Sequence, residues 1–240
     1  MMPQAVAGPV DTYVDQLRRE LGGSLAAVYA VGSLALGDFS HKQSNVDLVV
    51  VADTVPDEES ARRLRRAEKP LDRAGRTAAV WHTTWEEVSG GPRTVARPSR
   101  LATPLTWAIL RNDPMPLFGP DWPVVWEDQV ALRTWALDRL NASASVGRGM
   151  LLLRRDVGPL VLETARLAQI AMTGRVLSKS EAGESVSGFV ATSHRRVLVD
   201  AVGYRQGAQT SMYWGPFERK YDALAVVEEL IVAARSTGPS

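Results

Sequence analysis

Two spacings of hydrophobic residues divide the first third of the chain into expected helices and strands. Apolar residues recur at helical spacing over Val10–Leu21, which predicts a helix that ends at the two following glycines. Leu25–Val31 and Val46–Ala52 are short apolar runs, and the β-branched residues of the second favour a buried strand. Asp57–Ala74 carries many arginines and is predicted as an exposed helix, and Arg76–Thr83 is predicted as a third strand.

The second half of the chain has a different pattern. A helix is expected at Leu105–Arg111, and prolines and glycines between residues 114 and 123 then interrupt regular structure. Beyond them the spacing is helical almost throughout, with expected helices at Gln129–Leu140, Pro159–Thr173, Lys179–Phe189 and Asp222–Arg235. We therefore expect an α/β domain over residues 1–126 and a C-terminal helical bundle domain over residues 127–240, with the functional cleft between them.

Composition and charge exclude several classes of function. Of the 240 residues, 45% are hydrophobic and 23% are charged, a balance typical of a soluble globular protein. The formal net charge of +1 argues against a general nucleic-acid binder, which would carry a basic excess. Cysteine is absent, so disulfides and thiolate chemistry are excluded. With no predicted signal peptide or membrane span, we expect a cytoplasmic protein without nucleic-acid or membrane partners.

The most informative segment is residues 28–51, which read VYAVGSLALGDFSHKQSNVDLVVV. Gly32 and Ser33 form a turn after the first strand, a short helix is expected next, and Asp47 lies on the second strand. The turn could approach a phosphate closely, because glycine lets the backbone come near and Ser33 and neighbouring N–H groups can donate to it. This arrangement resembles the nucleotidyltransferase superfamily, in which Gly-Ser is followed by Ser-Asp-x-Asp on the next strand. Ser44 matches the serine of that pattern.

Two further stretches narrow the resemblance. Thr173–Glu184 reads TGRVLSKSEAGE, and Trp107–Pro120 ends in Leu-Phe-Gly-Pro. Both are similar to the spectinomycin and streptomycin adenylyltransferases, in which a helical domain follows the nucleotidyltransferase domain. Ser178 is also predicted to cap a helix, with Glu181 as its capping-box partner. The resemblance implies Mg²⁺, ATP and an aminoglycoside as ligands, provided that the metal site is intact.

The metal site departs from the family pattern. Three carboxylates are expected, but Asn45 takes the place of the first and Arg76 aligns with the third, so only Asp47 remains. The three side chains carry a formal charge of zero instead of −3. A guanidinium about 4 Å away would repel a divalent cation by about 8 kcal/mol at an effective dielectric constant near 20. We expect no metal and no cofactor. Arg76 either pairs with Asp47 and binds a new ligand, or points to solvent.

Other candidate residues have two interpretations each. Trp81, Trp107 and Trp126 either line an aromatic cleft for a planar or hydrophobic small molecule or pack in the core. His82 is predicted on the same strand as Arg76, where it could titrate near neutral pH, but histidines are more often structural. Lys179 is a candidate phosphate contact, or a solvated lysine at a helix start.

Three functions are consistent with these observations. The first, which we favour, is a repurposed enzyme that acts on a small molecule without metal, for example in specialised-metabolite biosynthesis. The second is an atypical nucleotidyltransferase that still uses ATP and Mg²⁺ through Ser33, Asp47 and an unrecognised acid. The third is a non-catalytic protein that binds or senses a small molecule. The sequence does not predict the oligomeric state.

Overall fold

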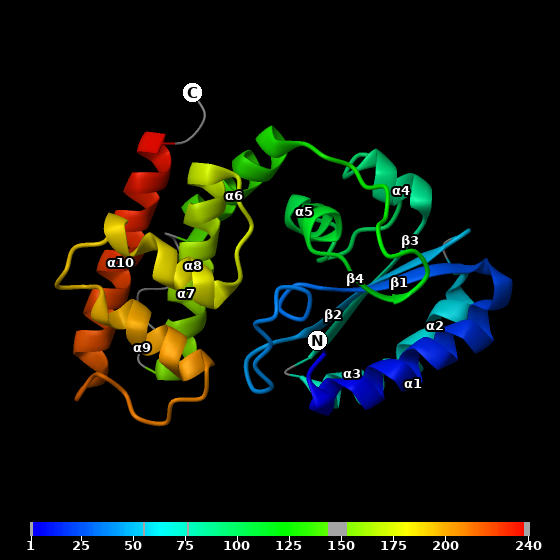
Figure 1. The fold of residues 1–240 in the computed structure, drawn as a ribbon, viewed down its shortest axis with the longest axis horizontal. Helices are drawn as coiled ribbons and strands as arrows, with labels where there is room; N and C mark the ends of the chain where they lie inside the picture. The colour runs from blue at the N-terminus through cyan, green and yellow to red at the C-terminus, as the bar shows by residue number, and fades with distance from the viewer. Residues whose placement is uncertain (1, 55, 76, 144–152, 238–240) are drawn as a thin grey trace. The chain divides into compact units, whose positions relative to one another are not determined.

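A computed structural model describes residues 2–54, 56–75, 77–143 and 153–237 of the chain (Figure 1). Arg76, which the sequence assigns to the candidate site, lies outside these residues. The chain divides into two compact units, Met1–Glu127 and Asp128–Ser240. This boundary lies one residue beyond the one expected from sequence. Within the described ranges, no helix combines the length and apolar character that crossing a membrane requires.

The first unit is built on a mixed four-stranded sheet. Its strands, in the order β3-β2-β1-β4, are β1 (Leu25–Val31), β2 (Val46–Ala52), β3 (Ala78–Thr83) and β4 (Met115–Phe118). β1 runs antiparallel to β2 and β4, whereas β2 and β3 are parallel. One face is covered by α1 (Gln4–Leu21), α2 (Glu58–Ala67) and α3 (Lys69–Ala74), and the other by α4 (Trp85–Gly90) and α5 (Pro104–Asn112) (Figure 1).

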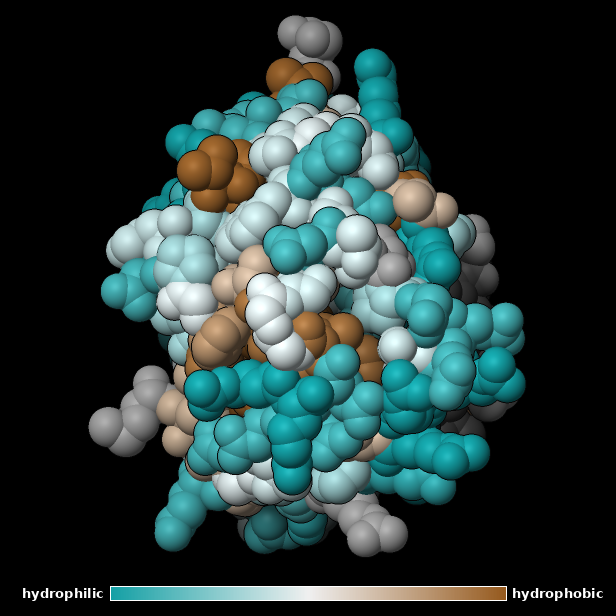
Figure 2. Space-filling model, turned by 90° about the vertical axis from the view of Figure 1, so that its right-hand side faces the viewer, coloured by the Kyte–Doolittle hydropathy of each residue, from teal (hydrophilic) through white to brown (hydrophobic). Residues whose placement is uncertain are grey.

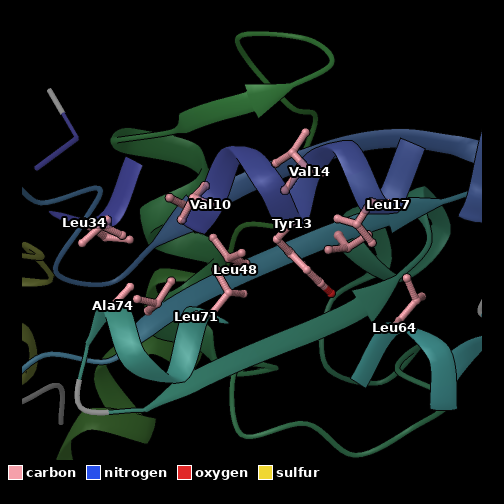
Figure 3. Packing of buried hydrophobic residues seen from close by; sticks show 14 of the residues in the cluster. Val10, Tyr13, Val14, Leu17, Leu34, Leu48, Leu64, Leu71 and Ala74 are labelled. Carbon is pink, nitrogen blue, oxygen red and sulfur yellow. The ribbon is translucent and has the colours of Figure 1, made fainter. Parts of the chain in front are cut away.

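An apolar core joins the first three helices to the sheet (Figure 3). Tyr13 and Leu17 of α1, Leu64 of α2 and Leu71 of α3 pack with Leu48 of β2, and each is at most 1% exposed. Because side chains alternate along a strand, positions 46, 48 and 50 of β2 face this core and the odd-numbered positions face α5. Away from the core, the face of the molecule drawn in Figure 2 is mainly hydrophilic, with a small apolar area near its centre.

The second unit is entirely helical in the residues that the structure describes. Its main helices are α6 (Gln129–Ser143), α7 (Arg154–Thr173), α8 (Lys179–Ser185), α9 (Arg196–Arg205) and α10 (Pro216–Thr237). α7 packs against each of the other four and is the central helix of the unit. The predicted capping box at the start of α8 is confirmed, since Ser178 accepts from the Glu181 N–H and the Glu181 carboxylate accepts from the Ser178 N–H.

Several predicted elements are wrong in detail. The expected short helix after Gly32 is a series of turns. The helix expected over Asp57–Ala74 is two helices, since α3 begins anew around Pro70, which has no N–H to continue the ladder of α2. β4 lies in the proline-rich stretch expected to be irregular, and it is an edge strand, where Pro116 is tolerated. α4 and α9 were not expected.

We predict that Leu48→Ala destabilises the first unit by about 2 to 5 kcal/mol, because it opens a cavity between β2 and the three covering helices. Val124→Ala serves as the control in the same unit, since Val124 is 80% exposed and its truncation should cost less than about 0.5 kcal/mol. Urea unfolding followed by circular dichroism measures both values. Equal losses in the two variants would contradict this description of the core.

Candidate functional site

Asp47 is the centre of the candidate site in the first unit. The other six residues of β2 are buried, and Asp47 alone is partly exposed. The strand pairing places it beside Val31 of β1 on one side and Ala79 of β3 on the other. Because neighbouring strands lie about 5 Å apart, the residues at these positions and just after them form the immediate surroundings of the carboxylate.

The turn after β1 approaches this carboxylate directly. Gly32 has a φ of +63°, in the left-handed region that favours glycine, and a Cβ added to it would lie 3.0 Å from Asp47 Oδ2. The turn is closed by the N–H of Leu36, which donates to the Gly32 carbonyl, and by that of Asp38, which donates to the Ser33 carbonyl. Gly32 is therefore brought against Asp47, and Ser33 follows it in the turn.

The third strand offers no second carboxylate on this side of the sheet. Trp81 of β3 contacts Trp107 of α5, so odd-numbered positions of β3 face α5, as does Asp47. These positions are occupied by Ala79, Trp81 and Thr83. Asn45, which precedes β2, supplies an amide in place of an acid. Among the described residues, no three His, Cys, Asp or Glu side chains come together as metal ligands. Among the residues that the structure describes, β2 and β3 bring a single carboxylate to this side of the sheet, which does not fit a site for two divalent metal ions.

Glu87 is the nearest buried acid in sequence after β3, and its carboxylate is used elsewhere. It is buried, accepts from the Thr83 hydroxyl at 2.6 Å and accepts from the Ala96 N–H at 2.8 Å. Thr83 pairs with Val51, four residues along β2 from Asp47, which corresponds to about 13 Å of strand. Glu87 therefore holds the loop after α4 and lies away from Asp47.

His82 is on the wrong face of the sheet for the predicted role. Its ring nitrogens are buried with no hydrogen-bond partner among the described residues, and Nε2 lies 3.7 Å from Oε1 of Glu68, at the α2–α3 junction. The Tyr13 hydroxyl of α1 is buried on the same side, where burial and the Glu68 carboxylate raise the pKa of Tyr13. Alternation along β3 therefore separates His82 from Asp47.

Ser44, which matches the serine of the family pattern, lies in the loop before β2. It is only 4% exposed, and its hydroxyl accepts from the Ser40 N–H at 2.9 Å. The Ser44 N–H in turn donates to the Ser40 carbonyl at 2.7 Å. These bonds shape the loop before β2. They leave the Ser44 side chain buried rather than presented to a ligand.

The three candidate tryptophans, Trp81, Trp107 and Trp126, pack against one another in the first unit. Trp81 and Trp107 are 2% and 1% exposed, and their rings pack edge to face with centroids 5.2 Å apart. Trp107 donates its indole N–H to the Val88 carbonyl at 2.8 Å and packs against Trp126 at 5.7 Å. The partly exposed Trp126 ring packs on Gly91 so closely that an added Cβ would lie 2.5 Å from it, which is too short for a van der Waals contact. The core-packing interpretation therefore describes Trp81 and Trp107, since rings this buried cannot contact a ligand.

Lys179 belongs to a group of charged side chains in the helical unit. Its Nζ lies 3.1 Å from Oε2 of Glu163, and Arg166 donates to both oxygens of that carboxylate, at 2.9 and 2.7 Å. Burial raises the pKa of Glu163, but the neighbouring Arg166 and Lys179 outweigh it and lower that pKa to about 2. Burial lowers the pKa of Lys179, and the charges of Arg166 and Arg205 lower it further, against the effect of Glu163. Lys179 is therefore not a simply solvated lysine.

Comparison with known proteins agrees with this architecture. Residues 10–96 match the nucleotidyltransferase domain family. Among solved structures, spectinomycin adenyltransferase AAD(9) from Enterococcus faecialis, solved with ATP and spectinomycin, is similar at a TM-score of 0.65 and 15% sequence identity, over 94% of this chain and 99% of that chain. Comparison with curated proteins found no significant match to the sequence. The chain thus has an aminoglycoside adenylyltransferase-like fold that begins with a nucleotidyltransferase domain, which confirms the expected fold class.

Sequence reasoning missed two features of these sites. It did not identify Ala79 as the residue opposite Asp47, because strand register cannot be read from a local pattern. It also missed the charged neighbours of Lys179. The spacing of Glu163 and Arg166, three residues apart on a predicted helix, could have indicated an ion pair. No local signal connects either of them to Arg205.

We predict that Gly32→Ala destabilises the chain more than Gly37→Ala. Both glycines have a positive φ, +63° and +66°, so alanine is strained by about 1 to 2 kcal/mol at either position. Gly37 has open space around its Cβ position, whereas at Gly32 the new methyl group meets Asp47. The excess cost should shrink in an Asp47→Ala background, as a double-mutant cycle from urea unfolding would measure. Equal costs for the two glycines would show that Asp47 does not lie against the turn.

We predict an acid-dependent contribution of Glu163 to stability. Its folded pKa of about 2 is below the usual 4.5, so its ion pairs stabilise fully above about pH 5 and are lost as the pH falls toward 2. The difference in unfolding free energy between wild type and Glu163→Gln should therefore be constant near neutrality and vanish near pH 2. For Glu184→Gln, at an exposed position of α8, the difference in unfolding free energy from wild type should not change over this pH range. A difference between wild type and Glu163→Gln that does not depend on pH would contradict the ion pairing.

Proposed function

We propose that the chain is a repurposed enzyme that acts on a small molecule in the first unit without two-metal adenylyl transfer. The observation that supports this most directly is the pairing of Asp47 with Ala79, since no acid of β3 shares the face of Asp47. A pair of divalent metal ions needs several carboxylate oxygens. One aspartate and one amide are a weak substitute.

The groups that remain can still do chemistry. Asp47 is partly exposed beside a turn of fixed shape, so it can accept a proton or a hydrogen bond from a bound substrate. Ser33 and the turn can orient a polar group, and Asn45 can both donate and accept. Positioning of this kind accelerates reactions without a metal ion. The proposed roles are a general base for Asp47 and substrate positioning for Ser33 and Asn45.

An atypical nucleotidyltransferase is the second candidate. It is favoured by the Gly32–Ser33 turn next to Asp47 and by the likeness to a fold solved with ATP and spectinomycin. On this reading the chain would bind ATP with Mg²⁺ through an acid supplied from elsewhere. The two candidates differ in one measurable property, which is whether nucleotide binding depends on Mg²⁺.

Calorimetric titration with ATP, with and without Mg²⁺, tests the proposal. We expect no micromolar, Mg²⁺-dependent binding by the wild-type chain. We expect Asn45→Asp combined with Ala79→Glu to bind Mg²⁺ at least about tenfold more tightly than Asn45→Asp combined with Ala79→Gln, because only the first pair adds a carboxylate opposite Asp47. The glutamine variant matches the glutamate in size and separates charge from packing.

Two results would contradict this proposal. Micromolar, Mg²⁺-dependent ATP binding by the wild-type chain would favour the atypical nucleotidyltransferase. Failure of the glutamate variant to gain Mg²⁺ would mean that Asp47 and position 79 cannot hold a metal ion together. For any small molecule found to bind, mass spectrometry of the mixture then separates an enzyme, which forms product, from a protein that only binds. Loss of product formation in Asp47→Asn would support the assigned general base.

A further inference from the structure

The last helix of the second unit has an exposed side that is mainly apolar. α10 packs against α7, and its buried residues lie on the side that faces the unit. The opposite side carries exposed residues spaced three, four or seven apart, which places them along one side of the helix and the turn before it. We call this set the outer stripe, and it comprises Trp214, Phe217, Tyr221, Glu228 and Val232. A surface helix usually carries polar residues on this side.

The outer stripe has the composition of a protein interface. Trp214 is fully exposed, and Phe217, Tyr221 and Val232 are 75%, 69% and 61% exposed. Aromatic residues are enriched at protein–protein interfaces, and apolar residues that gather on a surface mark such interfaces. Glu228 is the one charged member of the outer stripe. The position of that charge restricts which partner can pack against the stripe.

The backbone that carries Trp214 is held in place by its neighbour Tyr213. The buried Tyr213 ring has the guanidinium carbon of Arg196 at 4.1 Å and that of Arg219 at 5.6 Å from its centroid. The Tyr213 hydroxyl donates to Oδ2 of Asp222 in α10 at 2.6 Å. Because this segment is already ordered, less conformational entropy is lost when a partner binds Trp214.

The order of residues along the outer stripe is complementary to itself. When two copies of a helix pack antiparallel about a two-fold axis, each residue lies opposite the one equally far from the axis on the other side. With the axis midway between Phe217 and Val232, each of these lies opposite the other in the second copy, and Tyr221 lies opposite Glu228. Apolar residues then meet apolar residues, and the one acid meets a phenol hydroxyl that can donate to it.

The ends of the outer stripe fit the same pairing. Trp214 lies just before the first turn of α10, so it reaches toward the last turn of the partner helix, where Arg235 is exposed. A guanidinium can stack on an indole ring, which is the best aromatic partner for a cation.

The apolar area of the outer stripe is sufficient for a weak dimer. An aromatic side chain buries roughly 150 to 250 Å², so the three aromatic residues and Val232 offer about 600 Å² on each copy. Specific protein interfaces begin at about that area on each partner. We infer that the outer stripe is the interface of a homodimer, in which two α10 helices pack antiparallel about a two-fold axis.

A second copy of this chain fits the outer stripe better than a membrane surface does. The Glu228 carboxylate lies between apolar members of the outer stripe, and it would be repelled by the anionic lipids that attract peripheral proteins. In the dimer the same carboxylate has a hydroxyl opposite it. This inference goes beyond the proposed function, and it does not depend on Asp47 or on any metal ion.

Sedimentation equilibrium of the full chain between about 5 and 500 µM tests the inference, and we expect a dimer with a Kd on the order of 10 µM. Tyr221→Glu should raise the Kd at least about tenfold, because two acids would then face each other across the interface. Tyr221→Lys removes the same ring but places a cation opposite Glu228, so it should raise the Kd by less than about threefold. Val124→Glu, at an exposed valine of the first unit, is the control and should change nothing.

A second substitution separates pairing across the interface from loss of structure. Tyr221→Glu combined with Glu228→Lys places opposite charges together again, so dimerisation should return, which an unfolded variant cannot do. Circular dichroism checks that each variant is folded.

Four results would overturn the inference. A chain that stays monomeric up to about 500 µM has no such interface. A dimer that Tyr221→Glu leaves unchanged uses another surface, and equal weakening by Tyr221→Glu and Tyr221→Lys would contradict the antiparallel pairing. A monomeric chain that binds vesicles of phosphatidylcholine and phosphatidylserine, and loses this binding in Phe217→Ser, would assign the outer stripe to a membrane surface instead.

Discussion

The pairing of β2 with its two neighbours is the constraint on which the first unit depends. β2 lies between an antiparallel strand and a parallel one, and its register decides what surrounds the one residue of the strand that is not buried. On one side, the backbone of Gly32 is so close to the Asp47 carboxylate that an added Cβ would lie 3.0 Å from its Oδ2. On the other side stands Ala79. A shift by one residue would move Asp47 into the apolar core, so the burial of its neighbours holds the register in place.

The same alternation explains why residues that are close in sequence have different roles. Trp81 and His82 are adjacent on β3, yet the first belongs to an aromatic core with Trp107 and the second faces Glu68 beneath α1. Neither lies open to a ligand beside Asp47. The sheet thus separates the candidate site from groups that a linear reading of the sequence would combine with it. The buried tryptophans stabilise the packing of the sheet against α5, since large aromatic rings contribute strongly to packing.

The fold and the site give different information about function. Likeness to a spectinomycin adenyltransferase at 15% identity describes the architecture, and architecture alone does not determine chemistry. Chemistry depends on single positions, such as the amide of Asn45 before β2 and the methyl group of Ala79 beside Asp47. In the helical unit, Lys179 and Arg166 concentrate positive charge around one carboxylate.

Local patterns in the sequence determined a large part of this structure. The bounds of β1 and β2 follow from apolar runs, and the capping box of α8 follows from Ser178 and its partner Glu181. These features depend on neighbours within a few residues. Tertiary structure decided the rest, including the residue opposite Asp47, the face occupied by His82 and the charges around Lys179. Each of these depends on register or helix packing between segments far apart in the chain, which no local pattern encodes.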